Sequence, residues 1–137
     1  MQTRLKMTDI FSLKVEEITS KIKDSQLTSV EVCEKYIERI KNFEKDVKAW
    51  VHFDKEILLE KAAEADEFRR SGKPTGPLHG IPVALKDIIG TVDMPTECGT
   101  SIRKGKSYSQ NAEIVDLLLS AGAIIMGKTT TSELAYL

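Results

Sequence analysis

The sequence has few of the residues that identify a metalloprotein or a nucleic-acid-binding protein. Only two cysteines and two histidines occur among its 137 residues, so no zinc-binding pattern can be assembled, and we expect no metal. A net charge of −1 leaves no basic surplus for nucleic acid or an anionic membrane surface. The low content of metal ligands and of basic charge is consistent with an enzyme acting on small molecules or with a protein-interaction module.

Long apolar runs are also absent. No stretch approaches the roughly 18 apolar residues of a membrane span, and the N-terminal MQTRLKMTDIFSLKVEE has no apolar core of signal-peptide length. We therefore expect a cytoplasmic protein that does not bind membranes. The final SELAYL resembles the first turn of a helix without a stop signal, which indicates a fragment.

Residues 1–72 are predicted to be helical. Thr28 and Glu31 are spaced as a capping box, and the helix that they open has four apolar residues on one face, namely Val32, Tyr36, Ile40 and Phe43. Asp54 is the expected N-cap of a second helix that Gly72 ends. Four residues of this region are expected to pack against helices or lie on their surface: Cys33, Trp50, His52 and Phe53.

Residues 73–137 have the pattern of an α/β core. A Gly- and Pro-rich loop precedes the predicted strand IPVALKDII, and a long irregular segment follows it. NAEIVDLLLSAG predicts a helix, AIIMGKT a buried strand, and SELAYL another helix with Ser132 as its cap. This order predicts an α/β fold whose sheet is mixed but mostly parallel, behind a helical N-terminal region.

Two motifs are better explained by structure than by chemistry. GAIIMGKT matches the P-loop expression, but the residues between its glycines are apolar and should form the strand itself, with Gly122 ending a helix and Gly127 a tight exit from the strand. Cys98 and His79 both lie in loops, and a Cys–His hydrolase would need them in contact. A half-buried thiol and a loop histidine remain the simpler interpretation.

Lys86 is the main candidate for chemistry. On a strand, Val83, Leu85 and Asp87 share one face, while Ala84, Lys86 and Ile88 share the other. The simpler alternative is an edge-strand lysine that reaches water. The functional alternative is a buried lysine, because desolvation lowers the pKa of a lysine and lets it act as a base.

The segment GPLHGIPVALKD resembles the core of the amidase signature family, usually close to GPLxGIPxxxKD. DMPTECGT, AGAIIMGKT and SELAYL follow in the family's order and spacing, and the resemblance runs from about residue 8 to the end of the chain. It implies the amidase signature fold, incomplete in this chain. It also explains the false P-loop, since AGAxxxGKT is common in the family.

The resemblance implies a mechanism in which Lys86 is the catalytic base of a Ser–cis-Ser–Lys triad, with no cofactor. The family's two serines belong to a GGSSGGS-like motif that these residues do not contain, so we expect the 137-residue chain alone to be inactive. Loops 76–80 and 95–101 are expected to shape the wall of the site.

The expected substrate is a small-molecule carboxamide. Ile88 and Thr130 replace the asparagines that the family often has, which favours a broad amidase over the A-subunit of a glutamyl-tRNA(Gln) amidotransferase, a relative that would bind tRNA and partner subunits. Two other classes stay open: a non-catalytic interaction fragment that forms a homodimer through its helices, and a P-loop nucleotide binder.

Overall fold

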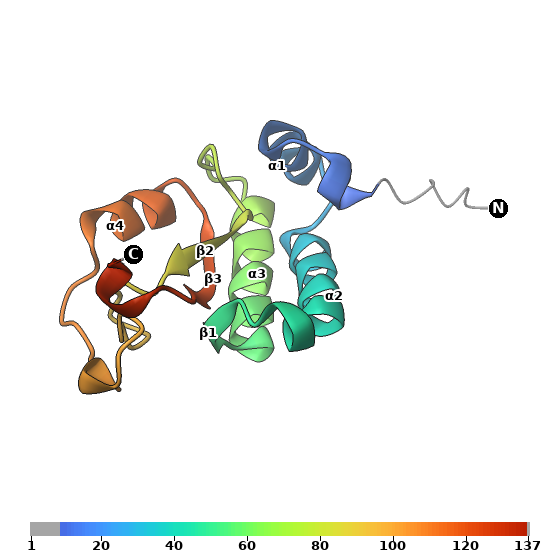
Figure 1. Cartoon of the computed structure of the whole chain (residues 1–137). Coiled ribbons are helices and arrows are strands. Elements are labelled where there is room, and N and C mark those ends of the chain that lie inside the picture. Colours follow the sequence, from blue (N-terminus) through green and yellow to red (C-terminus); the bar gives the residue numbers. More distant parts are fainter. Residues whose placement is uncertain (1–8, 137) are drawn as a thin grey trace.

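The computed structural model describes residues 9–136 as a mixed α/β structure (Figure 1). Its regular elements, in chain order, are η1 (Ile10–Ser12), α1 (Val15–Lys23), α2 (Ser29–Val47), β1 (Trp50–Phe53), α3 (Lys55–Arg70), β2 (Pro82–Lys86), η2 (Ser101–Arg103), α4 (Glu113–Ser120), β3 (Ile124–Thr129) and η3 (Glu133–Ala135). The predicted α/β class is confirmed. Residues 1–8, part of the predicted helical region, lie outside the described residues.

Local capping fixes where the long helices begin. The Thr28 hydroxyl accepts from the Glu31 amide at 3.0 Å, and the Glu31 carboxylate accepts from the Thr28 amide at 2.8 Å, as the predicted capping box requires. The Asp54 carboxylate likewise caps the amides of Glu56 and Ile57 at the start of α3. These helices therefore start where the sequence places their caps.

One strand was not foreseen in the region predicted to be helical. Trp50–Phe53 forms β1, which pairs antiparallel with β3, so the interpretation of His52 as a helical residue is wrong. α2 ends at Val47, where Lys48 adopts the left-handed conformation and turns the chain. Two aromatic residues and a valine within four positions favour an extended chain, and pairing with a strand about 75 residues later completes it.

The sheet has the strand order β1-β3-β2, which puts β3 in the centre. β2 runs parallel to β3, with Pro82 as its first residue, where a missing amide proton costs least. The register shifts between Val83 and Ala84, because β3 has one additional residue there. The sheet is thus mixed, with one parallel and one antiparallel pair of strands.

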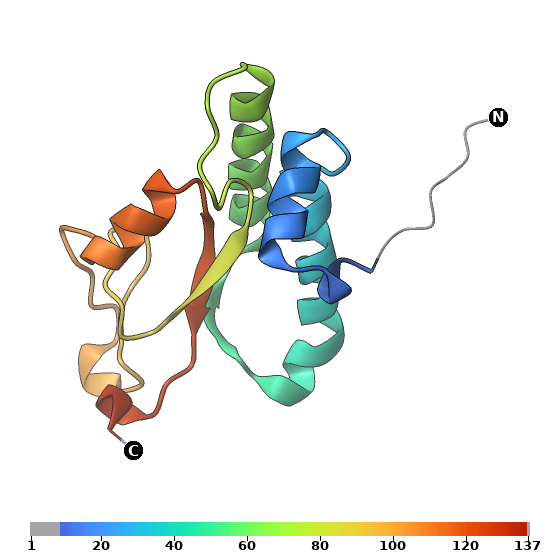
Figure 2. The same cartoon turned by 90° about the horizontal axis from the view of Figure 1, so that it is seen from above.

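Helices cover both faces of this sheet. Ile124 and Met126 pack in one cluster with Leu58 and Ala62 of α3 and with α2, whereas Ile125 packs with Leu85 and with Val115 of α4. Figure 2 shows the three strands between α1–α3 on one side and α4 on the other. β3 is therefore enclosed on both faces, while β2 is an edge strand in the described structure.

The segment that matches the P-loop expression is a strand rather than a phosphate-binding loop. Gly122 has a φ of +89° and follows the end of α4, as expected for a helix stop. Gly127 lies inside β3 and not at its exit; a Cβ there would be 2.3 Å from the His52 carbonyl oxygen, so the glycine allows β1 to approach. The apolar residues between these glycines form the core of β3.

The last described residues differ from the expected helix. Glu133–Ala135 form a single 3-10 turn in which Leu134 has a φ of +50°, and the Ser132 side chain makes no capping hydrogen bond. The turn instead connects to another part of the chain, since the Leu134 amide donates to the Cys98 carbonyl at 2.7 Å. A tertiary hydrogen bond has replaced the regular helical pattern here.

Candidate active site

Lys86 is the last residue of β2, and its side chain is exposed. Its neighbours on the same face, Ala84 and Ile88, are exposed too, while Leu85 and Asp87 on the other face are buried. The predicted alternation of faces is confirmed. The desolvation expected of a lysine base is not found within residues 9–136, and Lys86 here has the surroundings of an edge-strand lysine.

The chain turns immediately after Lys86. Its carbonyl oxygen accepts hydrogen bonds from the amides of Ile88 at 2.7 Å and Ile89 at 3.0 Å. Between them, the Asp87 amide continues the ladder by donating to the Thr129 carbonyl at 2.9 Å. The main chain of Lys86 is thereby fixed from both sides, although its side chain is free to extend.

Asp87 holds the loop that passes beside the end of β2. Its fully buried carboxylate accepts from the Glu97 amide at 3.2 and 3.3 Å, and its carbonyl accepts from the Cys98 amide at 2.9 Å. Loop 95–101 therefore lies beside Asp87, the residue that follows Lys86. The loop is tightly folded here, since Cys98 adopts a φ of +55°.

A different lysine is buried nearby, and the sequence interpretation missed it. Lys128 of β3 is 0% exposed, and its ammonium group donates to the Ile89 carbonyl at 2.8 Å, the Thr96 hydroxyl at 2.7 Å and the Pro95 carbonyl at 3.3 Å. The signal was present, because a lysine directly after AIIMG continues a central apolar strand. Because GAIIMGKT is not a P-loop, the sequence pattern alone assigned no role to Lys128.

Burial lowers the pKa of Lys128 below its ordinary value of 10.5, and the negative charges of Asp87 and Asp93 oppose this shift only in part. No carboxylate of residues 9–136 lies within 4.0 Å of the Lys128 ammonium nitrogen. Its direct hydrogen-bond partners are therefore neutral oxygens. Such an arrangement costs free energy unless all three protons are satisfied, as they are here.

The second predicted loop does not reach Lys86. Loop 76–80 precedes β2 and is hydrogen-bonded to the end of α4, with Leu78 donating to the Ala121 carbonyl and Gly80 to the Gly122 carbonyl. His79 in this loop is buried, and its Nε2 lies 3.0 Å from the Ala65 carbonyl. Loop 76–80 is thus at the opposite end of β2 from Lys86, which argues against a place in that site's wall.

This placement also separates His79 from Cys98. His79 precedes β2, whereas Cys98 is hydrogen-bonded to Asp87 just after it, so the length of the strand lies between them. A Cys–His pair needs hydrogen-bond contact. The structure therefore supports the simpler interpretation of a half-buried thiol and a packed histidine.

The surface has one hollow beside the end of β2 and another between η1 and α2. One lies beside Asp87 and is lined mainly by loop 95–104, namely Val51, Asp87, Glu97, Gly99, Thr100, Ser101 and Lys104. Near it, the Glu97 carboxylate is 3.5 Å from Nε2 of His52 on β1. This hollow is the one that adjoins the Lys86 end of β2.

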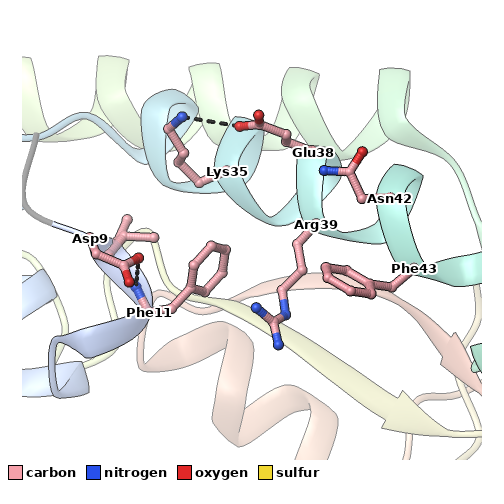
Figure 3. Close-up of a pocket in the computed structure, with 8 residues that line it drawn as sticks. Asp9, Phe11, Lys35, Glu38, Arg39, Asn42 and Phe43 are labelled. Carbon is pink, nitrogen blue, oxygen red and sulfur yellow. Dashed lines mark hydrogen bonds and ion pairs between the residues drawn. The ribbon is translucent and has the colours of Figure 1, made fainter.

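The other hollow, drawn in Figure 3, lies between η1 and α2. In it the Arg39 guanidinium lies 4.9 Å from the ring centre of Phe11 and 5.3 Å from that of Phe43. Phe43, expected on the buried face of α2, is 53% exposed. Among residues 9–136, no serine, threonine, tyrosine or cysteine lines this hollow, so it offers no hydroxyl or thiol nucleophile.

Residues 9–136 contain no cluster of three or more histidine, cysteine, aspartate or glutamate side chains placed to hold a metal ion. In the same part of the chain, no helix has the length and apolar character needed to cross a membrane.

Comparison with known families agrees with this arrangement. Residues 31–137 match the model of the family described as Amidase. This chain belongs to the amidase family. The match covers the helices α2 and α3, the whole sheet and the Lys86 segment, so the resemblance first indicated by GPLHGIPVALKD is confirmed.

Amidase-family relatives differ in what their names describe. The chain is 40% identical over 129 residues to the A-subunit of the glutamyl-tRNA(Gln) amidotransferase of Streptomyces coelicolor, covering 94% of this chain and 26% of that protein. Among solved structures, it is similar to the peptide amidase of Stenotrophomonas maltophilia, with 33% identity, a TM-score of 0.81, and coverage of 89% of this chain and 25% of that one.

A third similar structure is an amidase family protein from Bacillus anthracis, with 29% identity, a TM-score of 0.78, and coverage of 94% of this chain and 28% of that one. The chain thus spans about a quarter of the length of the amidase relatives that it matches. The fold of that quarter is confirmed as the amidase fold.

Proposed function

We propose that this chain supplies the catalytic base of an amidase that hydrolyses a small linear carboxamide to a carboxylic acid and ammonia or an amine. The observation that carries the proposal is the position of Lys86 at the carboxyl end of a parallel strand, within the KD segment of an amidase-family chain. Sites of α/β proteins lie at the carboxyl ends of parallel strands. No cofactor or metal takes part in this mechanism.

In the proposed reaction, the uncharged amine of Lys86 accepts a proton from a bridging serine, which accepts the proton of the nucleophilic serine. The nucleophile attacks the amide carbonyl, the amine leaves with a proton, and water then releases the acid from the acyl-enzyme. Both serines must come from outside these 137 residues, whose sequence contains no GGSSGGS-like motif. The chain alone is therefore expected to be inactive.

Two features of the described structure suit Lys86 to this role. No carboxylate of residues 9–136 lies within 4.0 Å of its side-chain nitrogen, so no ion pair within the described structure holds the side chain away from a partner serine. Its main chain is fixed on both sides by hydrogen bonds of the turn and the ladder. In the complete enzyme that we propose, the segment carrying the serines would cover this exposed face and shield Lys86 from water.

The tRNA-linked amidotransferase is the second candidate, and a specific observation favours it. Several relatives that are 34–40% identical to this chain are named as the A-subunit of a glutamyl-tRNA(Gln) amidotransferase. The replacements Ile88 and Thr130 favour the broader amidases instead. Release of ammonia from glutamine that increases when tRNA and partner subunits are added would support this candidate, whereas turnover of simple carboxamides by the protein alone would support the first.

The deciding experiment measures ammonia release from a panel of carboxamides by the complete protein that contains this chain. Lys86→Ala should lower kcat by about 1,000-fold or more, because proton transfer from the serine pair is lost. Lys86→Arg should be equally inactive, because arginine retains the positive charge but does not act as a base. Lys41→Ala, at an exposed lysine of α2, is the matched control. Activity retained in Lys86→Arg would contradict the assignment.

A further inference from the structure

Lys128 makes a complete set of hydrogen bonds to one short segment of the chain. Its three ammonium protons meet three oxygens, those of Ile89, Pro95 and Thr96, all of which belong to the segment that follows β2. Lys128 itself comes from the central strand and is fully buried. One side chain thus ties both ends of residues 89–96 to the most enclosed strand of the sheet.

We propose that Lys128 is a positioning residue, which anchors residues 87–98 and thereby holds the main chain of Lys86 in its catalytic orientation. This inference rests on the proposed function of Lys86. In this proposal Lys128 does not contact the substrate; it acts on Lys86 through the hydrogen-bonded residues between them.

The first connection between the two lysines is short. Lys128 donates to the carbonyl of Ile89, and the amide of the same residue donates to the carbonyl of Lys86 at 3.0 Å. Two hydrogen bonds, with one residue between them, therefore link the buried ammonium to the Lys86 backbone. Loss of the first bond would release the turn that the second one closes.

The second connection runs through loop 95–98. Lys128 holds the hydroxyl of Thr96, and the next two amides, of Glu97 and Cys98, donate to the carboxylate and the carbonyl of Asp87. Asp87 is the neighbour of Lys86. The loop is thus held at one end by Lys128 and at the other by the residue adjoining the candidate base, so both connections converge on Lys86.

A purely stabilising role accounts poorly for this residue. A buried ammonium without a carboxylate within 4.0 Å contributes less to stability than an apolar side chain that fills the same space. What an apolar side chain cannot do is fix the orientation of three oxygens at once. The geometry of Lys128 therefore favours a role in holding one particular loop conformation.

The test compares Lys128→Met with Lys61→Met in the complete protein. Lys61 binds the same loop through Asp93 at 3.0 Å, but both side chains of this pair are partly exposed, so Lys61→Met controls for loss of a lysine contact with this segment. Lys128→Met should speed hydrogen exchange of the amides in residues 87–98 by about 10-fold or more, whereas Lys61→Met should leave it nearly unchanged.

The kinetic expectation separates positioning from general stability. Lys128→Met should lower kcat on a carboxamide by about 10- to 100-fold with KM changed less than about threefold, because a displaced base affects the chemical step more than binding. Thr96→Val, which removes one of the three acceptors, should change exchange and kcat in the same direction but less. It keeps the proposal testable if Lys128→Met does not fold.

Three outcomes would overturn the proposal. Exchange in residues 87–98 that is no faster in Lys128→Met and Thr96→Val than in Lys61→Met would show that there is no anchor. Faster exchange with unchanged kcat would show an anchor that does not position Lys86. If the wild-type protein hydrolyses no carboxamide, the proposed function fails and the catalytic half of this inference fails with it, while the exchange measurement still decides the anchoring half.

Discussion

The helical layer, residues 10–70, and the segment after β2, residues 87–98, are held by different forces. The helical layer buries isoleucines, valine and leucine in two apolar clusters against each other and the sheet. The segment after β2 has no regular element. Ile89 and Met94 pack against the sheet, but its loop is held mainly by hydrogen bonds of the buried side chains Asp87, Thr96 and Lys128. Apolar packing supplies the free energy of folding, whereas the polar contacts select one loop conformation.

Stability and the candidate chemistry depend on different parts of this chain. Residues that stabilise the fold lie in α1–α3 and on the enclosed faces of β3, while the candidate base lies on an exposed edge. A site built on a rigid sheet with a polar loop beside it can hold reacting groups without depending on tight apolar packing around them.

The largest stability effect is expected in the apolar region. Leu58→Ala should lower the free energy of unfolding by about 3 kcal/mol, because it leaves a cavity between α3 and the sheet at a residue that is 1% exposed. Chemical denaturation of the complete protein measures the change. An equally large loss for Ile57→Ala, at a neighbouring residue that is 49% exposed, would show that burial does not set the cost.

A buried carboxylate within the helical layer sharpens the comparison. Asp66 of α3 accepts from the amides of Ser29 at 2.7 Å and Val30 at 3.1 Å at the start of α2. Asp66→Ala should cost about 2 kcal/mol, because one buried and one partly buried amide lose their acceptor. Chemical denaturation of Asp66→Ala and Leu58→Ala under the same conditions compares the free energy lost with the buried hydrogen bonds with that lost with apolar packing. A cost below that of an exposed control, Glu64→Ala, would contradict the ranking.

A smaller, pH-dependent effect is expected from Cys33. Burial, with a smaller effect from Asp66, raises the pKa of the Cys33 thiol from 9.0 to about 12. The unfolded chain therefore loses this proton above pH 9 while the folded chain keeps it, so stability falls as pH rises, by about 1 kcal/mol at pH 10.

Cys33→Ala removes that titration, and the stability gap between wild type and variant should narrow from pH 8 to pH 10. Paired denaturation curves at the two pH values measure the change. Lys128→Met should show the opposite sign: burial lowers the pKa of Lys128, so the unfolded chain binds more protons than the folded one, and wild type should become more stable relative to this variant as pH rises. A gap that is constant with pH in both variants would show that neither group is desolvated.

Most of the regular structure could be predicted from the sequence because its signals are local. The capping box at Thr28, the N-cap at Asp54 and the helix stop at Gly122 each depend on contacts with residues only a few positions away in the sequence. β1 was missed because a segment of only four residues between two helices is too short for the alternating pattern that distinguishes a strand from a helix. The SELAYL helix was wrongly predicted because a bond to Cys98 competes with it.

The sequence alone determined the helices of the N-terminal region, the strands β2 and β3, the alternation of faces around Lys86, and the resemblance to amidases. Only the tertiary structure decided which lysine is buried, because burial depends on strand order: Lys128 is on the central strand and Lys86 on an edge. It also decided that loop 95–101, and not loop 76–80, lies beside Asp87. The hydrogen bond between Asp87 and Glu97 joins residues 10 positions apart and that between Lys128 and Ile89 joins residues 39 positions apart, and no local sequence pattern encodes such long-range contacts.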